Sequence, residues 1–265
     1  MINFTVKPLN NPWQNELEAV INGKTKPLGA LGQLEDVAKQ LASIQSQGQA
    51  SVVESIEIDN PTMLVFAGDH GIAQHGVSIA PSAVTRQMVL NFIAGGAALN
   101  CFCRTNNIAL KIIDAGIVEA ITPNEIADDA LFFEQRLAPG TQDFSTTAAM
   151  TSSQVNIGLA YGATMAVQEI AQGCNLLMLG EMGIGNTTSA AAIMHFITKQ
   201  EIDYCVGQGT GVDKQTIAIK KQIIMKAASR HRNNLDDAVS VRTQVGGFEI
   251  AQMVGAMLAI AEAGK

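Results

Sequence analysis

Short apolar runs alternate with longer stretches of helical periodicity along most of the chain. Three of the runs are typical of strands buried in a parallel sheet, namely Thr62–Ala67, Ile108–Asp114 and Asn175–Leu179. The stretches between and after them predict helices over Ser82–Arg104, Ser152–Gln172, Thr187–Thr198, Lys214–Arg230 and Gly247–Ala263. Strands separated by helical crossovers favour an α/β fold, here a Rossmann-like parallel sheet flanked by helices.

The first 58 residues follow a different pattern. Helical spacing over Asn11–Ile21 and Leu31–Ile44, joined by the turn Gly23–Gly29, predicts a pair of helices ahead of the first strand. We therefore expect a small helical subdomain over residues 1–58 and a Rossmann-like large domain over 59–265. The apolar last helix runs to Lys265 with no closing strand, so we expect the large domain to be C-terminally incomplete.

Composition narrows the class of partner. The 265 residues carry a formal net charge of −7, and their 17 basic side chains are scattered, so no basic stripe is available to neutralise a nucleic-acid backbone. No apolar run approaches the roughly 20 residues that span a bilayer, and Met1–Leu9 lacks an apolar signal core. These features favour a cytoplasmic protein with a small-molecule partner. They exclude nucleic acids and membranes as partners.

Four cysteines give no sign of a metal site. They include no CxxC pair and have no histidines at zinc-finger spacing, so we expect buried free thiols and no bound metal: Cys101, Cys103, Cys174 and Cys205.

Two glycine-rich segments are typical of phosphate binding. Gly180–Ser189 follows the third predicted strand and opens a helix, where backbone N–H groups and hydroxyls favour an anion. It lacks the lysine of a Walker A loop, and its glycines could instead serve only a tight turn. Gly207–Gly211 repeats the theme before a helix from which Lys220 could reach a phosphate, although lysines there could equally solvate the outer face.

Two further segments could contribute to a site. Asp69 and His70 stand at the end of the first strand, where they could act in acid–base chemistry or serve only as turn and loop residues. Ser78 and Gln87, among apolar neighbours, could line a slot for a flat ring, or belong simply to a capped helix.

Taken together, these segments closely resemble the nicotinate-nucleotide–dimethylbenzimidazole phosphoribosyltransferase family. They occur in the same order as in that family and extend along almost the whole chain. The segments that carry the resemblance are Lys26–Gly32, Phe66–Gly71, Gly76–Ser78 with Pro81, Val84–Val89, Gly95–Asn100, Gly180–Ser189, Gly209–Gly211 and Gly246–Ala251. The resemblance implies transfer of 5-phosphoribosyl from nicotinate mononucleotide to 5,6-dimethylbenzimidazole, giving α-ribazole 5′-phosphate for the lower ligand of cobalamin, without a cofactor. It also implies a homodimer whose small helical domain is built from both chain ends.

The resemblance assigns roles residue by residue. Glu181 is a supporting catalytic residue, and the substrate-binding residues are Ser78, Gln87, Met182, Gly183, Gly185, Asn186, Thr187, Gly209, Gly211 and Lys220. Family members run roughly a third longer, and their catalytic base is a glutamate beyond the point that corresponds to Lys265. Two hypotheses therefore stand: an active phosphoribosyltransferase, or a truncated, catalytically deficient relative that binds nucleotide or a partner chain without turnover.

Overall fold

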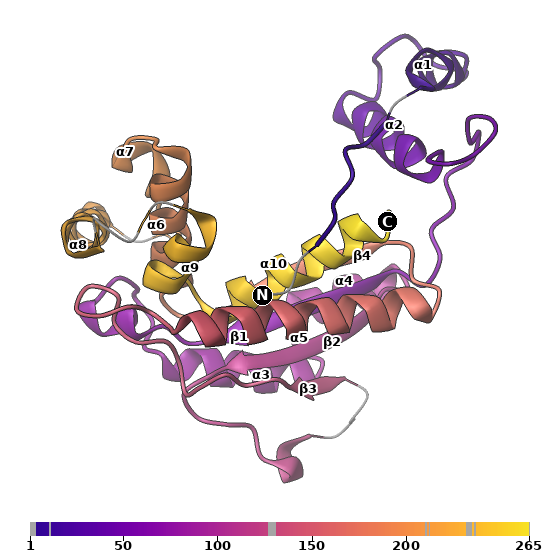
Figure 1. Cartoon of the computed structure of the whole chain (residues 1–265). Coiled ribbons are helices and arrows are strands. Elements are labelled where there is room, and N and C mark those ends of the chain that lie inside the picture. Colours follow the sequence, from indigo (N-terminus) through magenta and orange to yellow (C-terminus); the bar gives the residue numbers. More distant parts are fainter. Residues whose placement is uncertain are drawn as a thin grey trace.

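A computed structural model describes residues 4–10, 12–126, 131–209, 211, 213–231, 235 and 237–264. Its centre is a parallel sheet with strand order β3-β2-β1-β4, formed by β1 (Thr62–Gly68), β2 (Ala109–Gly116), β3 (Phe132–Glu134) and β4 (Leu177–Met182). Helices cover both faces of the sheet (Figure 1). The predicted Rossmann-like parallel sheet flanked by helices is thereby confirmed.

The central strand β1 is buried on both faces, as the continuous apolar run predicts. Leu64 and Phe66 pack against α5 (Ser152–Ala171) and α10 (Phe248–Glu262), while the alternate residues of β1 face α3 (Ala83–Ile93). Crossing of α5 and α10 requires glycine, because a Cβ on Gly162 would lie 1.7 Å from the carbonyl oxygen of Gln252. The two helices thus form one continuous cover over this face of the sheet (Figure 1).

The helix predicted over Ser82–Arg104 is wrong as a single element. It divides into α3 and α4 (Ala98–Thr105) at Gly95, whose φ of +77° ends the first helix. Asn100 joins the two, since its Oδ1 accepts from the amide of Ala97 and its Nδ2 donates to the carbonyl of Phe92. The side chain of Asn100 thus stabilises the break between α3 and α4, which the helical periodicity of the sequence does not indicate.

The expected loop Glu119–Thr147 contains the short strand β3 and a 3₁₀ turn, η2 (Pro123–Glu125); residues 127–130 lie outside the described part. The helices described between β4 and α10 are α6 (Asn186–Thr198), α7 (Ile202–Cys205), α8 (Lys214–His231) and α9 (Ala238–Val245). The cysteine prediction is only half right: Cys103 and Cys174 are buried free thiols, but Cys101 is exposed and Cys205 is partly exposed. No helix in the described ranges is long and apolar enough to cross a membrane.

The predicted N-terminal helix pair is present as α1 (Gln14–Asn22) and α2 (Gln33–Gln45), which stand away from the sheet (Figure 1). The Lys26–Gly32 segment joins them, and Lys26 Nζ lies 2.9 Å from a carboxylate oxygen of Glu35. Aliphatic side chains of both helices line a cavity of about 280 Å³ between them. The Lys26–Gly32 segment therefore links α1 to α2 and contacts α2 through Lys26. The domain boundary between residues 58 and 59 stays a prediction.

Asp114 at the end of β2 makes stability depend on pH. Burial raises the pKa of this carboxyl group to about 6, against two backbone hydrogen bonds and Arg136. Between about pH 4 and pH 6 the folded chain retains a proton that the unfolded chain releases, so the free energy of unfolding falls as pH rises. Across this window we expect the free energy of unfolding of the unaltered protein to fall by up to about 3 kcal/mol more than that of Asp114→Asn. Urea unfolding of both proteins at several pH values measures this difference, and parallel curves would contradict the prediction.

Candidate functional site

The candidate site forms where β4 gives way to α6. β4 lies beside β1, with Glu181 in register with Phe66, so the loop that follows passes over the end of β1. A Cβ on Gly183 would lie 2.1 Å from the carbonyl oxygen of Gly68, and Gly185 has a φ of +99°. Only glycine permits this close approach and this turn, and together they direct the N-terminus of α6 toward the carboxyl edge of the sheet.

One pocket of about 210 Å³ collects most of the residues predicted for the site. Those that line it are Ser78, Glu181, Met182, Gly183, Gly185, Asn186, Thr187 and Lys220, together with Val77 and Ile184. The strand begins two residues later than predicted and extends through Met182, so Glu181 lies on β4 and not in the loop. Pairing of β4 with β1 therefore holds the backbone of Glu181, which lines the pocket.

Lys220 supplies the positive charge of the pocket. Its side chain is 2% exposed, and its Nζ donates a hydrogen bond of 3.1 Å to the hydroxyl of Thr187. No carboxylate of the described ranges lies within ion-pair distance of it, and burial lowers its pKa. A buried ammonium group beside a helix N-terminus, with no counter-ion among the described residues, favours an anionic ligand.

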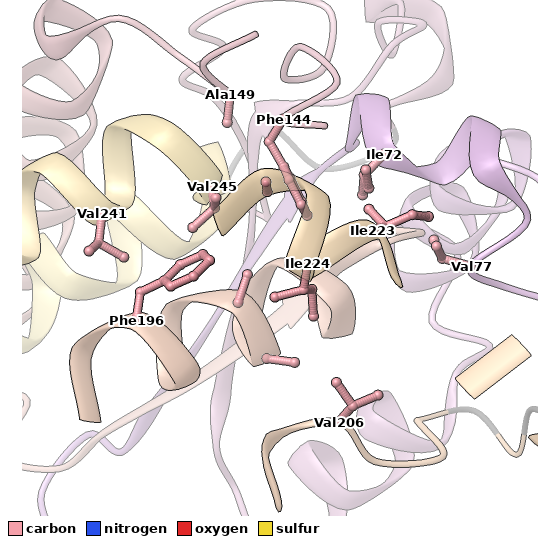
Figure 2. Close-up of a cluster of buried hydrophobic side chains, with 13 residues drawn as sticks. Ile72, Val77, Phe144, Ala149, Phe196, Val206, Ile223, Ile224, Val241 and Val245 are labelled. Carbon is pink, nitrogen blue, oxygen red and sulfur yellow. The ribbon is translucent and has the colours of Figure 1, made fainter. Parts of the chain in front are cut away.

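Core packing explains why Lys220, of the four lysines on α8, faces inward. Ile223 and Ile224, one turn further along the helix, belong to a buried cluster with Phe144 and Phe196 (Figure 2). Helical periodicity places Lys220 on that same face. Lys221, the next residue, instead pairs with Asp203 at 2.6 Å. The apolar core thus holds α8 so that a single lysine enters the pocket.

The second glycine segment lies against this lysine. Gly209 has a φ of +56°, and a Cβ at this position would lie 3.3 Å from Lys220 Nζ and 3.3 Å from the hydroxyl of Thr187. Gly211 has a φ of +89°, and a Cβ at this position would meet no described residue within 4 Å; Thr210 and Val212 lie outside the described residues. The loop thus places Gly209 beside Lys220 and Thr187, and the binding of phosphate by Gly209 and Gly211 stays a prediction.

Glu181 is held by its neighbours in the loop. The side-chain Nδ2 of Asn186 donates to Oε2 of Glu181, and Oδ1 of Asn186 accepts from the backbone amide of Thr187 at 2.6 Å. Restricted hydration raises the pKa of Glu181, the Glu249 carboxylate raises it further, and Asn186 and His70 oppose the shift. A raised pKa makes this carboxylate a stronger base.

Other predicted residues lie outside the pocket. Gln87 is exposed on α3 and does not line it, so its role in binding a base stays a prediction. Asp69 is buried and accepts from the amide of Val118 at 2.8 Å, and His70 is buried as well, so a part for either in acid–base chemistry stays a prediction. The hydroxyl of Thr85 accepts from the amide of Ile184 at 3.0 Å and ties α3 to the site loop.

Comparison with known proteins gives consistent matches along the chain. A family model described as phosphoribosyltransferase matches residues 6–265. The nicotinate-nucleotide–dimethylbenzimidazole phosphoribosyltransferase of Vibrio parahaemolyticus is 54% identical over 246 residues, which cover 92% of this chain and 70% of that protein. The enzyme of the same name from Photobacterium profundum is 53% identical over 259 residues, which cover 98% and 72%. The crystal structure of CobT from Thermus thermophilus superposes with a TM-score of 0.84 at 35% identity, over 94% of this chain and 72% of that one.

Proposed function

The chain belongs to the phosphoribosyltransferase family, and from that membership we propose that it transfers 5-phosphoribosyl from nicotinate mononucleotide to 5,6-dimethylbenzimidazole. The products are α-ribazole 5′-phosphate and nicotinate, and the reaction serves the assembly of the cobalamin lower ligand. One observation carries the proposal: the buried Lys220 ammonium has no protein counter-ion among the described residues and faces the glycine loop at the start of α6. A phosphate monoester dianion fits such a group.

Phosphate binding fixes the rest of the donor. With its phosphate at Lys220, the hydroxyl of Thr187 and the first amides of α6, the ribose extends toward Glu181 along the same pocket. Holding the donor at one end orients C1′ for attack, which converts a bimolecular encounter into a step between aligned groups. The contribution of this part of the chain is therefore mainly positioning.

The chemistry then needs one displacement and one proton transfer. The C1′–N bond to the pyridinium ring breaks, and its electron pair neutralises the leaving nicotinate ring nitrogen. A benzimidazole nitrogen attacks C1′ from the opposite face, while the proton on its other nitrogen passes to a base. Glu181 is the only carboxylate among the described residues that line the pocket, and we propose that it accepts this proton, which goes beyond the supporting role that the resemblance implies for it.

Gln87 tests the acceptor side of the proposal. If its amide binds the edge of the flat base, Gln87→Ala should raise the KM for dimethylbenzimidazole about 10-fold and leave the affinity for nicotinate mononucleotide near its starting value. Steady-state kinetics with each substrate varied in turn separates the two effects. An equal change for both substrates, or none for the benzimidazole, would remove Gln87 from the acceptor site.

A direct assay tests the reaction itself. The purified protein is incubated with nicotinate mononucleotide and dimethylbenzimidazole, and the products are separated by chromatography and identified by mass spectrometry. We expect α-ribazole 5′-phosphate and nicotinate in equal amounts. Calorimetric binding of the nucleotide without any product would instead favour the catalytically deficient relative.

The cytoplasmic homodimer and the division into a small domain over residues 1–58 and a large domain over 59–265 are also part of the proposal. Outward-facing apolar side chains on α5 and α10 support self-association, because Ile157, Tyr161 and Met257 remain between 38% and 49% exposed. Light scattering after size-exclusion chromatography measures the mass directly. A monomer at all concentrations would contradict the homodimer.

A further inference from the structure

A buried pair of titratable side chains lies outside the pocket and takes no part in the displacement chemistry. The imidazole Nε2 of His70 lies 2.8 Å from Oε1 of Glu249, and both side chains are completely buried. They come from residues 179 positions apart, at the end of β1 and in the first turn of α10. Burial lowers the pKa of His70, but the Glu249 carboxylate more than offsets this, so its pKa is raised overall. Removing two such groups from water contributes little net stability, which points to a role other than holding the core together.

The pair lies directly beneath the site loop. A Cβ on Gly185 would lie 3.1 Å from the Cβ of His70, and a Cβ on Gly183 would lie 3.5 Å from its Cδ2. From the other side, a Cβ on Gly247 would lie 2.5 Å from both carboxylate oxygens of Glu249 and from Cε1 of His70. These glycines from β4–α6 and from the start of α10 enclose the ring, so the hydrogen bond to Glu249 determines the ring orientation against which the loop packs.

We infer that His70 and Glu249 are positioning residues that hold the Gly183–Gly185 loop, and through it Glu181 and the first amides of α6, in the geometry required at the phosphoribosyl group. The part of this inference that concerns catalysis rests on the proposed function. Both residues act through the loop, because neither lines the pocket. Displacement of such a loop by about 1 Å would be enough to lower the rate about 10²-fold.

Amide hydrogen exchange tests the inference without reference to the reaction. In Glu249→Gln, peptides covering residues 180–188 should exchange about tenfold faster, while peptides from β1 and β2 keep their rates. Glu262→Gln, the same change at the exposed end of α10, is the control and should leave both regions unchanged. Should Glu249→Gln fail to fold, His70→Gln is measured in its place. Unchanged exchange in the loop, or faster exchange everywhere, would overturn the inference.

A double-mutant cycle tests the catalytic part. Glu249→Gln should lower kcat about 10- to 100-fold and change the KM for nicotinate mononucleotide less than about threefold. In a Glu181→Gln background the same change should have almost no further effect on kcat, because we expect the effect on kcat to depend on the position of Glu181. If the decreases in kcat caused by Glu249→Gln and by Glu181→Gln multiply in the double variant, the His70–Glu249 pair has only a structural role. If the unaltered protein forms no product, the proposed function fails, and the exchange experiment still decides the positioning role.

Discussion

Replacing Glu181 with glutamine is expected to lower kcat about 10²- to 10³-fold while the affinity for nicotinate mononucleotide changes little. The amide keeps the size of the side chain and one acceptor oxygen, but it cannot accept the benzimidazole proton, and general-base catalysis is typically worth about 10²–10⁴-fold. Binding of the donor depends on Lys220 and the α6 amides, so it should persist.

Product formation under saturating substrates measures this loss, and calorimetry measures donor binding. Glu201→Gln is the matched control, because Glu201 is an exposed glutamate that precedes α7 and does not line the pocket. Turnover within about twofold of the unaltered protein would assign the base to another group.

Replacing Lys220 with alanine should weaken nicotinate mononucleotide binding by about 1.5–3 kcal/mol, which is about 10- to 150-fold in Kd. A charge-assisted hydrogen bond to the phosphate is lost, while the other contacts of the nucleotide remain. The free protein should not lose stability, because the change removes a buried charge that no carboxylate of the described residues neutralises.

Lys221→Ala provides the control, since this lysine is adjacent in sequence but pairs with Asp203 outside the pocket. Its affinity for the nucleotide should equal that of the unaltered protein. Calorimetric titration of the three proteins decides the matter, and equal affinities for all three would exclude Lys220 from the phosphate site.

Elements with strong local signals could be predicted from the sequence. β1 could be predicted because a continuous apolar run lies between Pro61 and Gly68. α5 could be predicted because its helical periodicity extends over 20 residues. The short strand β3 has no such signal: it has three residues, and its pairing with β2 defines it. The break between α3 and α4 depends on the side chain of Asn100, which periodicity does not register.

The candidate site shows the same division. The glycine loop before α6 could be located because strand, glycines and helix adjoin in sequence, which is the local pattern of an anion site. Choosing Lys220 among four lysines of α8 required the resemblance, since the core cluster that turns it inward is assembled from distant segments (Figure 2). The His70–Glu249 pair could not be predicted, because only the meeting of β1 with α10 brings these residues together.

A crystal structure of the protein with nicotinate mononucleotide would test the central claim most directly, namely that this pocket holds a phosphoribosyl group. The account predicts a phosphate oxygen within about 3 Å of Lys220 Nζ, the other oxygens at the first amides of α6, and C1′ facing the carboxylate of Glu181. Nucleotide bound elsewhere, such as in the cavity between α1 and α2, or a phosphate directed away from Lys220, would contradict it.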